Sequence, residues 1–286
     1  MCLICQGESL ENLEELKVCE NVSEIPELPQ SLIDLDCSEC PLLITLPKLP
    51  QSLLYLDCSD CPLLTTLPEL PLSLTEFYCA GYPLLTTLPK LPQLLTYLDC
   101  DECPLLTTLP KLPQLLTYLD CAECPLLTIL PELPQSLICL CCNGCHLLTT
   151  LPELPQSLIY LYCYSCPLLT TIQKFPYSLL CVDCNWCSVL TTLPTLPQSL
   201  TCLNCEECTS LIFVPRNALR FIPHYLLEII TNNYLKWRKE QTLYWFSSTH
   251  GIVYEELIKR TWHPSRVVDW CWDTEEVKWF KLLPQS

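Results

Sequence analysis

Apolar residues recur along this chain with a period of 21 residues, marked most clearly by cysteine. The cysteines that carry the period are Cys37, Cys58, Cys79, Cys100, Cys121, Cys142, Cys163, Cys184 and Cys205. Each unit reads approximately L-P-x-L-P-Q-S-L-x-x-L-x-C-x-x-C-P-L-L-T-T, without an insertion. The alternation L-x-C predicts a short β-strand in every unit. Because one unit cannot bury its own leucines, the period predicts a solenoid of stacked turns.

The segment between two strands is rich in proline. Each unit carries an L-P-x-L-P run, and the chain has 27 Pro but only 4 Gly. A proline ring removes an amide donor and fixes φ, so these runs do not form helices. We therefore expect extended or polyproline backbone on the convex side of the solenoid and a parallel β-sheet on its concave side.

A degenerate unit precedes the regular ones and explains the two cysteines. It runs from Leu13 to Asn21 and resembles the leucine-rich-repeat consensus L-x-x-L-x-L-x-x-N, with Val18 in place of the first cysteine and Asn21 in place of the second. The first cysteine is thus predicted to be an inward residue of the strand. The second occupies the slot where Asn or Cys bonds the backbone of a neighbouring turn.

These motifs resemble the short, proline-type leucine-rich repeats of bacterial type III secreted effectors, whose units read L-P-x-L-P-x-x-L-x-x-L-x-V-x-x-N. They also resemble the cysteine-rich leucine-rich-repeat proteins of giant DNA viruses. The resemblance covers residues 10 to about 214 and departs from the effectors by one extra residue per turn and by Cys in place of Asn. It implies a leucine-rich-repeat arc that binds partners, and arrays of this kind bind many unrelated ones.

The chain divides into three expected parts. Residues 1–24 form an N-terminal cap with the degenerate repeat, residues 25–214 form nine 21-residue units, and residues 215–286 form a small, mostly helical module. Six of the seven tryptophans lie beyond residue 236. Helical spacing predicts helices near 223–241 and 252–261. We expect the module to cover the end of the solenoid or to dock it to a larger assembly.

The net charge of the chain limits the kinds of partner that it is expected to bind. The formal net charge is −17, and residues 1–209 hold 24 Asp and Glu against 5 Lys and Arg. An acidic array repels phosphate backbones and anionic lipid, so neither nucleic acid nor a membrane is the expected partner. A basic protein surface or peptide fits better. The N-terminus lacks the features of a signal peptide, which predicts a reducing cytoplasmic setting, in the host cytoplasm if the protein is viral.

The cysteine pairs have a second interpretation, since C-x-x-C repeated after seventeen residues is zinc-site spacing. In a stacked array the two cysteines of a pair point into different layers, and Tyr82 replaces the second cysteine in one unit. We therefore favour buried core thiols over a metal or redox role, and we expect no cofactor. Cys139, Cys141, Cys181 and Cys202 differ, because they fall at outward strand positions, where exposed thiols are expected.

The outward strand positions define a candidate binding face of two columns. The first column is Asp34, Tyr55, Glu76, Tyr97, Tyr118, Cys139, Tyr160, Cys181 and Cys202. The second column is Asp36, Asp57, Tyr78, Asp99, Asp120, Cys141, Tyr162, Asp183 and Asn204. Tyrosine offers a large, stiff contact area, and carboxylates attract Lys or Arg. The stacked carboxylates of Asp99 and Asp120 repel each other unless a partner or a cation such as calcium lies between them.

The candidate partner-binding residues are Asp36, Tyr55, Asp57, Tyr78, Tyr97, Asp99, Tyr118, Asp120, Tyr160, Tyr162 and Asp183. The alternative is that tyrosine is present as a good β-former and aspartate as a solvated residue. No catalytic residues are expected. Cys271 and Asp273 resemble the C-x-D motif of the ubiquitin-ligase domains that follow such repeats. The tryptophans on both sides of Cys271 are equally consistent with a role in packing.

Other residues of the C-terminal module give weaker signals. His224, His250 and His263 lie near no recognisable base or ligand motif. In the adaptor hypothesis, Trp237, Arg238, Lys239, Trp262 and Arg266 dock a larger assembly such as a ubiquitin-ligase complex. The sequence therefore favours a non-enzymatic protein-interaction scaffold.

Overall fold

The computed structural model describes residues 2–218 and 220–248. The helical elements are α1 (Leu3–Gln6), the 3-10 turn η1 (Arg216–Ala218) and α2 (His224–Ser248). The strands are β1 (Glu15–Lys17), β2 (Asp34–Asp36), β3 (Tyr55–Asp57), β4 (Glu76–Tyr78), β5 (Tyr97–Asp99), β6 (Tyr118–Asp120), β7 (Cys139–Cys141), β8 (Tyr160–Tyr162), β9 (Cys181–Asp183) and β10 (Cys202–Asn204).

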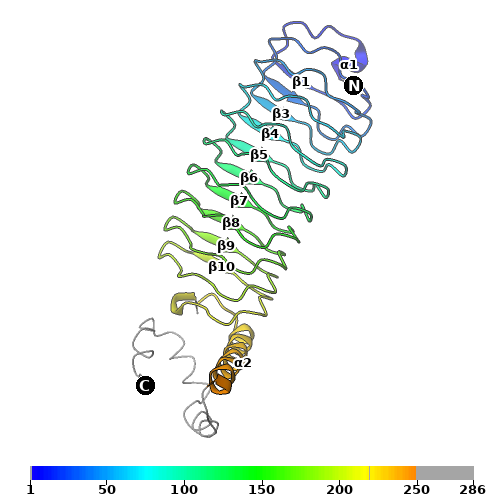
Figure 1. The fold of residues 1–286 in the computed structure, drawn as a ribbon. Helices are drawn as coiled ribbons and strands as arrows, with labels where there is room; N and C mark the ends of the chain where they lie inside the picture. The colour runs from blue at the N-terminus through cyan, green and yellow to red at the C-terminus, as the bar shows by residue number, and fades with distance from the viewer. Residues whose placement is uncertain (1, 219, 249–286) are drawn as a thin grey trace.

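The ten strands form one parallel sheet in sequence order, from β1 to β10. The register is one residue opposite one residue throughout, as in Leu98 opposite Leu119. Every turn therefore lies directly on the preceding one, and the chain rises as an elongated coil with the strands stacked along its length (Figure 1). The predicted repeat solenoid is confirmed. No helix interrupts residues 18–201, as the proline runs predicted.

The core runs through the middle of the coil. The central residue of each strand is buried, with Leu35, Leu56 and Leu98 fully inaccessible to solvent. Both cysteines of each regular pair are also buried, which confirms the core interpretation of the repeat cysteines. Since each turn contributes the same set of apolar side chains, burying one turn requires the next, and the core is continuous.

A tight turn separates the two cysteines of every pair. The residue before the second cysteine has a left-handed backbone in each regular unit, with φ of 54° at Asp60 and 57° at Glu207. Glycine takes this position at Gly81 and Gly144. An added Cβ at Gly144 would approach the Glu123 carboxylate of the preceding turn, which is the flexible end of an exposed side chain and can move aside.

Serine side chains link the proline-rich runs of successive turns by hydrogen bonds. In seven units a serine hydroxyl donates to a backbone carbonyl of the preceding turn, as Ser136 does to the Leu116 carbonyl at 2.6 Å and Ser157 to the Leu137 carbonyl at 2.6 Å. Leu94 and Leu115 stand at this position in the two other regular units. These bonds satisfy backbone acceptors where the prolines leave no sheet ladder to do so.

The N-terminal end confirms the alignment of the degenerate unit. Lys17 lies opposite Asp36, which places Val18 level with the first cysteine of the next turn. Val18 is buried like the cysteines that follow it. Helix α1 packs Leu3 and Ile4 against this first turn. The segment 1–24 therefore joins the same sheet and core as the regular units.

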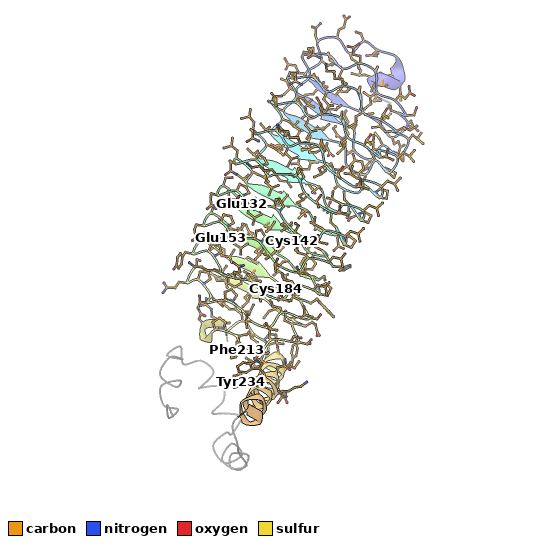
Figure 2. All side chains as sticks on the ribbon, in the orientation of Figure 1. Glu132, Cys142, Glu153, Cys184, Phe213 and Tyr234 are labelled. Atoms are coloured by element: carbon orange, nitrogen blue, oxygen red, sulfur yellow. The ribbon has the colours of Figure 1, made fainter. Side chains whose placement is uncertain are left out.

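Helix α2 covers the other end. Leu226, Ile230 and Tyr234 are buried, and the ring of Tyr234 meets that of Phe213 edge-on, with ring centroids 5.5 Å apart (Figure 2). The helix extends to Ser248, beyond the predicted end at 241, while the helix predicted near 252–261 lies outside the described residues. Among the helices that are described, none is both long and apolar enough to cross a bilayer.

Candidate binding face

The structure places the two predicted columns as the sequence indicated. Tyr97 lies opposite Glu76 on one side and Tyr118 on the other, and Asp99 lies between Tyr78 and Asp120. All eleven candidate residues are therefore on one face of the sheet, at the ends of three-residue strands. Their side chains are mostly half-buried, because the outward side chains of adjacent strands lie against each other.

Four tyrosines on β3 to β6 form a continuous stack. The ring centroids of Tyr55 and Tyr78 are 5.3 Å apart, those of Tyr78 and Tyr97 are 4.7 Å apart, and those of Tyr97 and Tyr118 are 4.2 Å apart with planes only 4° from parallel. The stack changes column at Tyr78, which meets the diagonal neighbours Tyr55 and Tyr97. Tyr160 and Tyr162 lie in one strand, with ring centroids 6.5 Å apart. The stack gives this part of the face a rigid aromatic surface.

The aspartates of the second column have a structural role that the sequence prediction missed. The Oδ1 atom of Asp99 accepts the backbone N–H of Asp101 at 3.2 Å, and that of Asp120 accepts the N–H of Ala122 at 3.0 Å. Asp36, Asp57 and Asp183 accept the equivalent N–H in their own turns. Each of these side chains therefore holds the turn after its strand. The Oδ2 atoms of Asp36, Asp120 and Asp183 accept hydrogen bonds from Lys17, Tyr118 and Asn204, respectively.

Three carboxylates gather beside the tyrosine stack. Ligand oxygens of Asp99, Asp101 and Asp120 all lie within 4.8 Å of one another. Burial, with a contribution from the neighbouring charges, raises the pKa of Asp99 to about 6 and that of Asp101 to about 7. Burial also raises the pKa of Asp120. The sequence indicated the repulsion between Asp99 and Asp120, but not that Asp101 joins them.

Cations are scarce on this face. Among residues 2–215, the one ion pair joins Lys17 to Asp36 at the N-terminal end of the sheet. Although burial opposes it, hydrogen bonds from Lys17 and Ser38 lower the pKa of Asp36. The other lysines of residues 1–209 all lie in the proline-rich runs, outside the sheet. The carboxylates of the central strands thus face one another without a cation from this part of the chain.

Two of the outward cysteines contradict the prediction of exposed thiols. Cys139 and Cys141 on β7 are buried, whereas Cys181 is half-buried and Cys202 is exposed. The Cys141 sulfur lies 3.9 Å from the Tyr118 hydroxyl and 3.9 Å from the Cys139 sulfur. Cysteine is shorter than tyrosine, so the side chains of β7 project less far from the sheet than the tyrosines of β6 and β8 on either side. The predicted exposure was therefore wrong for β7.

In seven regular pairs the second cysteine donates its thiol to a backbone carbonyl 24 residues earlier, and in the first pair Cys40 donates to the Cys19 carbonyl, 21 residues earlier. Examples are Cys61 to the Cys37 carbonyl at 3.1 Å and Cys187 to the Cys163 carbonyl at 3.1 Å. Tyr82 takes the place of this cysteine in its unit and donates its hydroxyl to the equivalent carbonyl, that of Cys58. Buried partners of this kind stabilise the turn, and the repeat pairs do not gather into clusters of three or more metal-ligating side chains within the described ranges.

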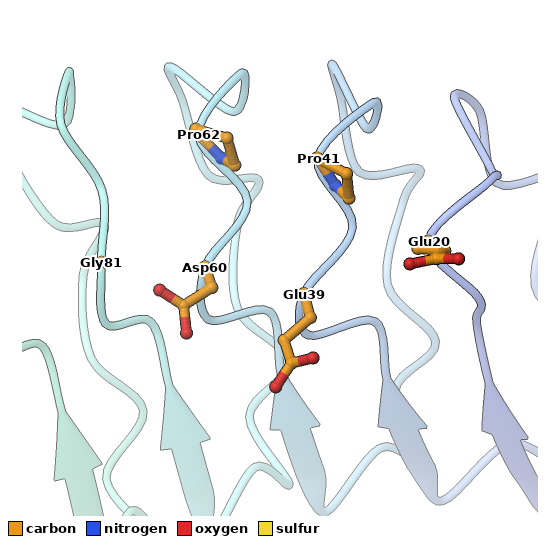
Figure 3. Close-up of a pocket in the computed structure, with 6 residues that line it drawn as sticks. All are labelled: Glu20, Glu39, Pro41, Asp60, Pro62 and Gly81. Carbon is orange, nitrogen blue, oxygen red and sulfur yellow. The ribbon is translucent and has the colours of Figure 1, made fainter.

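A shallow groove runs along the turns that follow β1 to β4. Glu20, Glu39, Asp60 and Gly81 occupy equivalent places in successive turns, with Pro41 and Pro62 above them (Figure 3). The three acidic side chains are exposed. The groove adds a second acidic strip beside the sheet face, so the negative charge extends from the face onto the turns.

Several candidate residues of the C-terminal module lie outside the described residues, namely Cys271, Asp273, His250, His263, Trp262 and Arg266. His224 begins α2, and Arg238 and Lys239 lie within it. The Trp237 ring contacts Phe213 and Tyr234, which assigns it a packing role against the last turn.

Three features of each 21-residue turn identify the architecture. Each turn has one strand, an inward-facing L-x-C and, after it, a residue that hydrogen-bonds the neighbouring turn. The fold is a leucine-rich-repeat solenoid. Solved structures similar to this chain are leucine-rich-repeat proteins. YopM from Yersinia enterocolitica WA-314 has 28% identity and a TM-score of 0.47, and the match covers 71% of this chain and 51% of that one. The chain therefore spans about half the length of that protein.

Two further solved structures are similar. YopM, a leucine-rich effector protein from Yersinia pestis, has 28% identity and a TM-score of 0.45, with 70% of each chain covered. A leucine-rich repeat protein from Bacteroides ovatus ATCC 8483 has 18% identity and a TM-score of 0.22, with 73% of this chain and 80% of that chain covered. No protein-family model and no curated protein matches the chain.

Proposed function

We propose that this protein is a non-enzymatic interaction scaffold that binds a basic protein surface or peptide on its sheet face. The observation that carries the proposal is the stack of Tyr55, Tyr78, Tyr97 and Tyr118 beside carboxylates that have no cation of their own. Tyrosine is enriched at protein interfaces, and complementary charge across an interface speeds association and sets specificity.

The charge of the face favours a basic partner. Asp99, Asp101 and Asp120 repel one another at close range, and a Lys or Arg brought by a partner relieves that repulsion. The planar guanidinium of Arg also stacks on aromatic rings, so it can use the tyrosines and the carboxylates together. The same charge disfavours nucleic acid and anionic membrane surfaces.

A cytoplasmic setting fits this proposal. The repeat thiols are buried hydrogen-bond donors, and reducing compartments keep thiols in that form. The described part of the C-terminal module packs on the last turn through Tyr234 and Trp237, which favours capping over docking as the role of α2. The proposal therefore places binding on the sheet face, with the adaptor role of the C-terminal module as the alternative.

The first test removes charge from the face without disturbing the turns. The double variant Asp99→Asn/Asp120→Asn keeps both Oδ1 acceptors and removes two charges. The control Glu132→Gln/Glu153→Gln removes two charges from exposed residues outside the sheet (Figure 2). We expect capture of partners from cell extract, quantified by mass spectrometry, to fall about tenfold for the face variant, equivalent to about 1.4 kcal/mol, and to stay unchanged for the control.

The second test locates the contact directly. A photo-cross-linking phenylalanine derivative at Tyr97 should attach the partner that depends on Asp99 and Asp120. The same derivative at Tyr177, which is 74% exposed and lies outside the sheet, should not. Equal cross-linking at both positions, or a partner retained by the face variant, rules out the sheet face as the binding surface.

A further inference from the structure

Three thiols converge at the N-terminal end, outside the regular repeat. The Cys2 sulfur lies 3.2 Å from the Cys19 sulfur, and the Cys5 sulfur lies 3.4 Å from the same atom. All three sulfurs lie within 4.8 Å of one another. Cys2 and Cys5 come from the start of the chain and from α1, whereas Cys19 comes from the turn after β1.

This cluster differs from the cysteine ladder of the core. The repeat cysteines are buried, and the second of each pair donates to a backbone carbonyl. Cys5 is exposed, and Cys2 and Cys19 are half-buried. Cys19 stands where later turns carry residues such as Ser38 and Ser59. Cys2 and Cys19 pack in part against the core, but core packing does not explain why the exposed Cys5 approaches them.

The separations between the sulfurs match a shared ion better than a covalent bond. A zinc ion with Zn–S bonds of about 2.3 Å holds tetrahedral thiolates about 3.8 Å apart. A disulfide requires sulfurs about 2.05 Å apart. The observed 3.2 Å and 3.4 Å lie nearer to the first value. The cluster also shows one sulfur in contact with two others, which a single disulfide does not produce.

We propose that Cys2, Cys5 and Cys19 form a binding site for one thiophilic metal ion of the zinc class. Thiolates select such ions over calcium or magnesium. Because Cys5 is exposed, solvent has access to complete a tetrahedral site as the fourth ligand. The ion would join α1 to the first turn, so that the cap covers the open end of the core beside β1.

Cobalt(II) is the probe for the test, because thiolate ligation gives it strong visible and near-ultraviolet absorption. The full chain is reduced with a phosphine, freed of metal and titrated with cobalt and then with zinc. We expect one cobalt ion per chain with thiolate-to-cobalt charge-transfer bands, displaced by zinc. Cys5→Ser should weaken binding by at least about 100-fold, since even groups that only support a ligand are worth 10–100-fold.

Two further variants complete the design. Cys202→Ser removes an exposed thiol at the other end of the sheet and should bind cobalt like the wild type. Cys19→Ser should lose the charge-transfer bands, while circular dichroism checks that each variant is folded. The proposal is overturned if cobalt binding survives in Cys5→Ser, if the wild type binds no cobalt, or if the reduced and re-isolated protein carries a disulfide between two of the three cysteines instead.

Discussion

Neutralising Asp101 should stabilise the protein at neutral pH. Asp101 lies with Asp99 and Asp120 in a cluster whose oxygens are within 4.8 Å of one another. At that separation two like charges repel by about 1–3 kcal/mol for effective dielectric constants between 80 and 20. Because all three side chains are partly exposed, solvent screens the repulsion, and we expect Asp101→Asn to gain about 1–2 kcal/mol at pH 8.

The stability gained by Asp101→Asn should be larger at high pH than at low pH. The pKa of Asp101 is raised to about 7 and that of Asp99 to about 6, above the value of about 3.9 for an unfolded chain. The folded state therefore holds more protons between about pH 4 and pH 7, so wild-type stability rises as the pH falls through this window. Asp36, whose pKa is lowered, loses its contribution only below this window. The advantage of Asp101→Asn should shrink from pH 8 to pH 5.

Urea denaturation followed by circular dichroism at pH 8 and pH 5 measures the effect. Glu132→Gln is the control for removing one charge from an acidic protein, because Glu132 is exposed and outside the sheet. Added salt should reduce the gain of Asp101→Asn, since screening weakens the repulsion. An equal gain in both variants, or a gain in Asp101→Asn that is the same at both pH values, would refute the electrostatic explanation.

Two further predictions concern the turns. Tyr82→Phe should destabilise the protein by about 1–3 kcal/mol, measured by the urea midpoint, because the buried Cys58 carbonyl loses its hydroxyl donor. Gly144→Ala should also destabilise it, by about 1–2 kcal/mol, because φ is 67° there and an L side chain is strained in that conformation. Adding Glu123→Ala should change this loss little, because the Glu123 carboxylate can move away from the new Cβ. Full stability of Gly144→Ala alone would show that the turn rearranges freely.

Much of the fold follows from the sequence. A period of 21 residues without insertion requires equivalent residues to lie one above another, so the register of all regular strands is fixed. Alternation along each strand then separates the buried Leu98 from the outward Tyr97 and Asp99. The sequence showed that Tyr82 replaces a cysteine, and the structure adds that its buried hydroxyl donates to the same acceptor as the thiols do.

The tertiary structure decided how side chains of adjacent turns meet. The Tyr118 side chain extends over β7 and helps to bury Cys141. The turn after β5 places the Asp101 carboxylate close to that of Asp99. The alternation of residues along a strand predicts on which face a side chain lies. It does not predict how much of that side chain the longer side chains of adjacent strands cover. The fold of the N-terminal cap brings Cys2 to Cys19, although neither belongs to the regular 21-residue units. Periodicity determines what recurs in every turn, whereas contacts made once depend on the three-dimensional path of the chain.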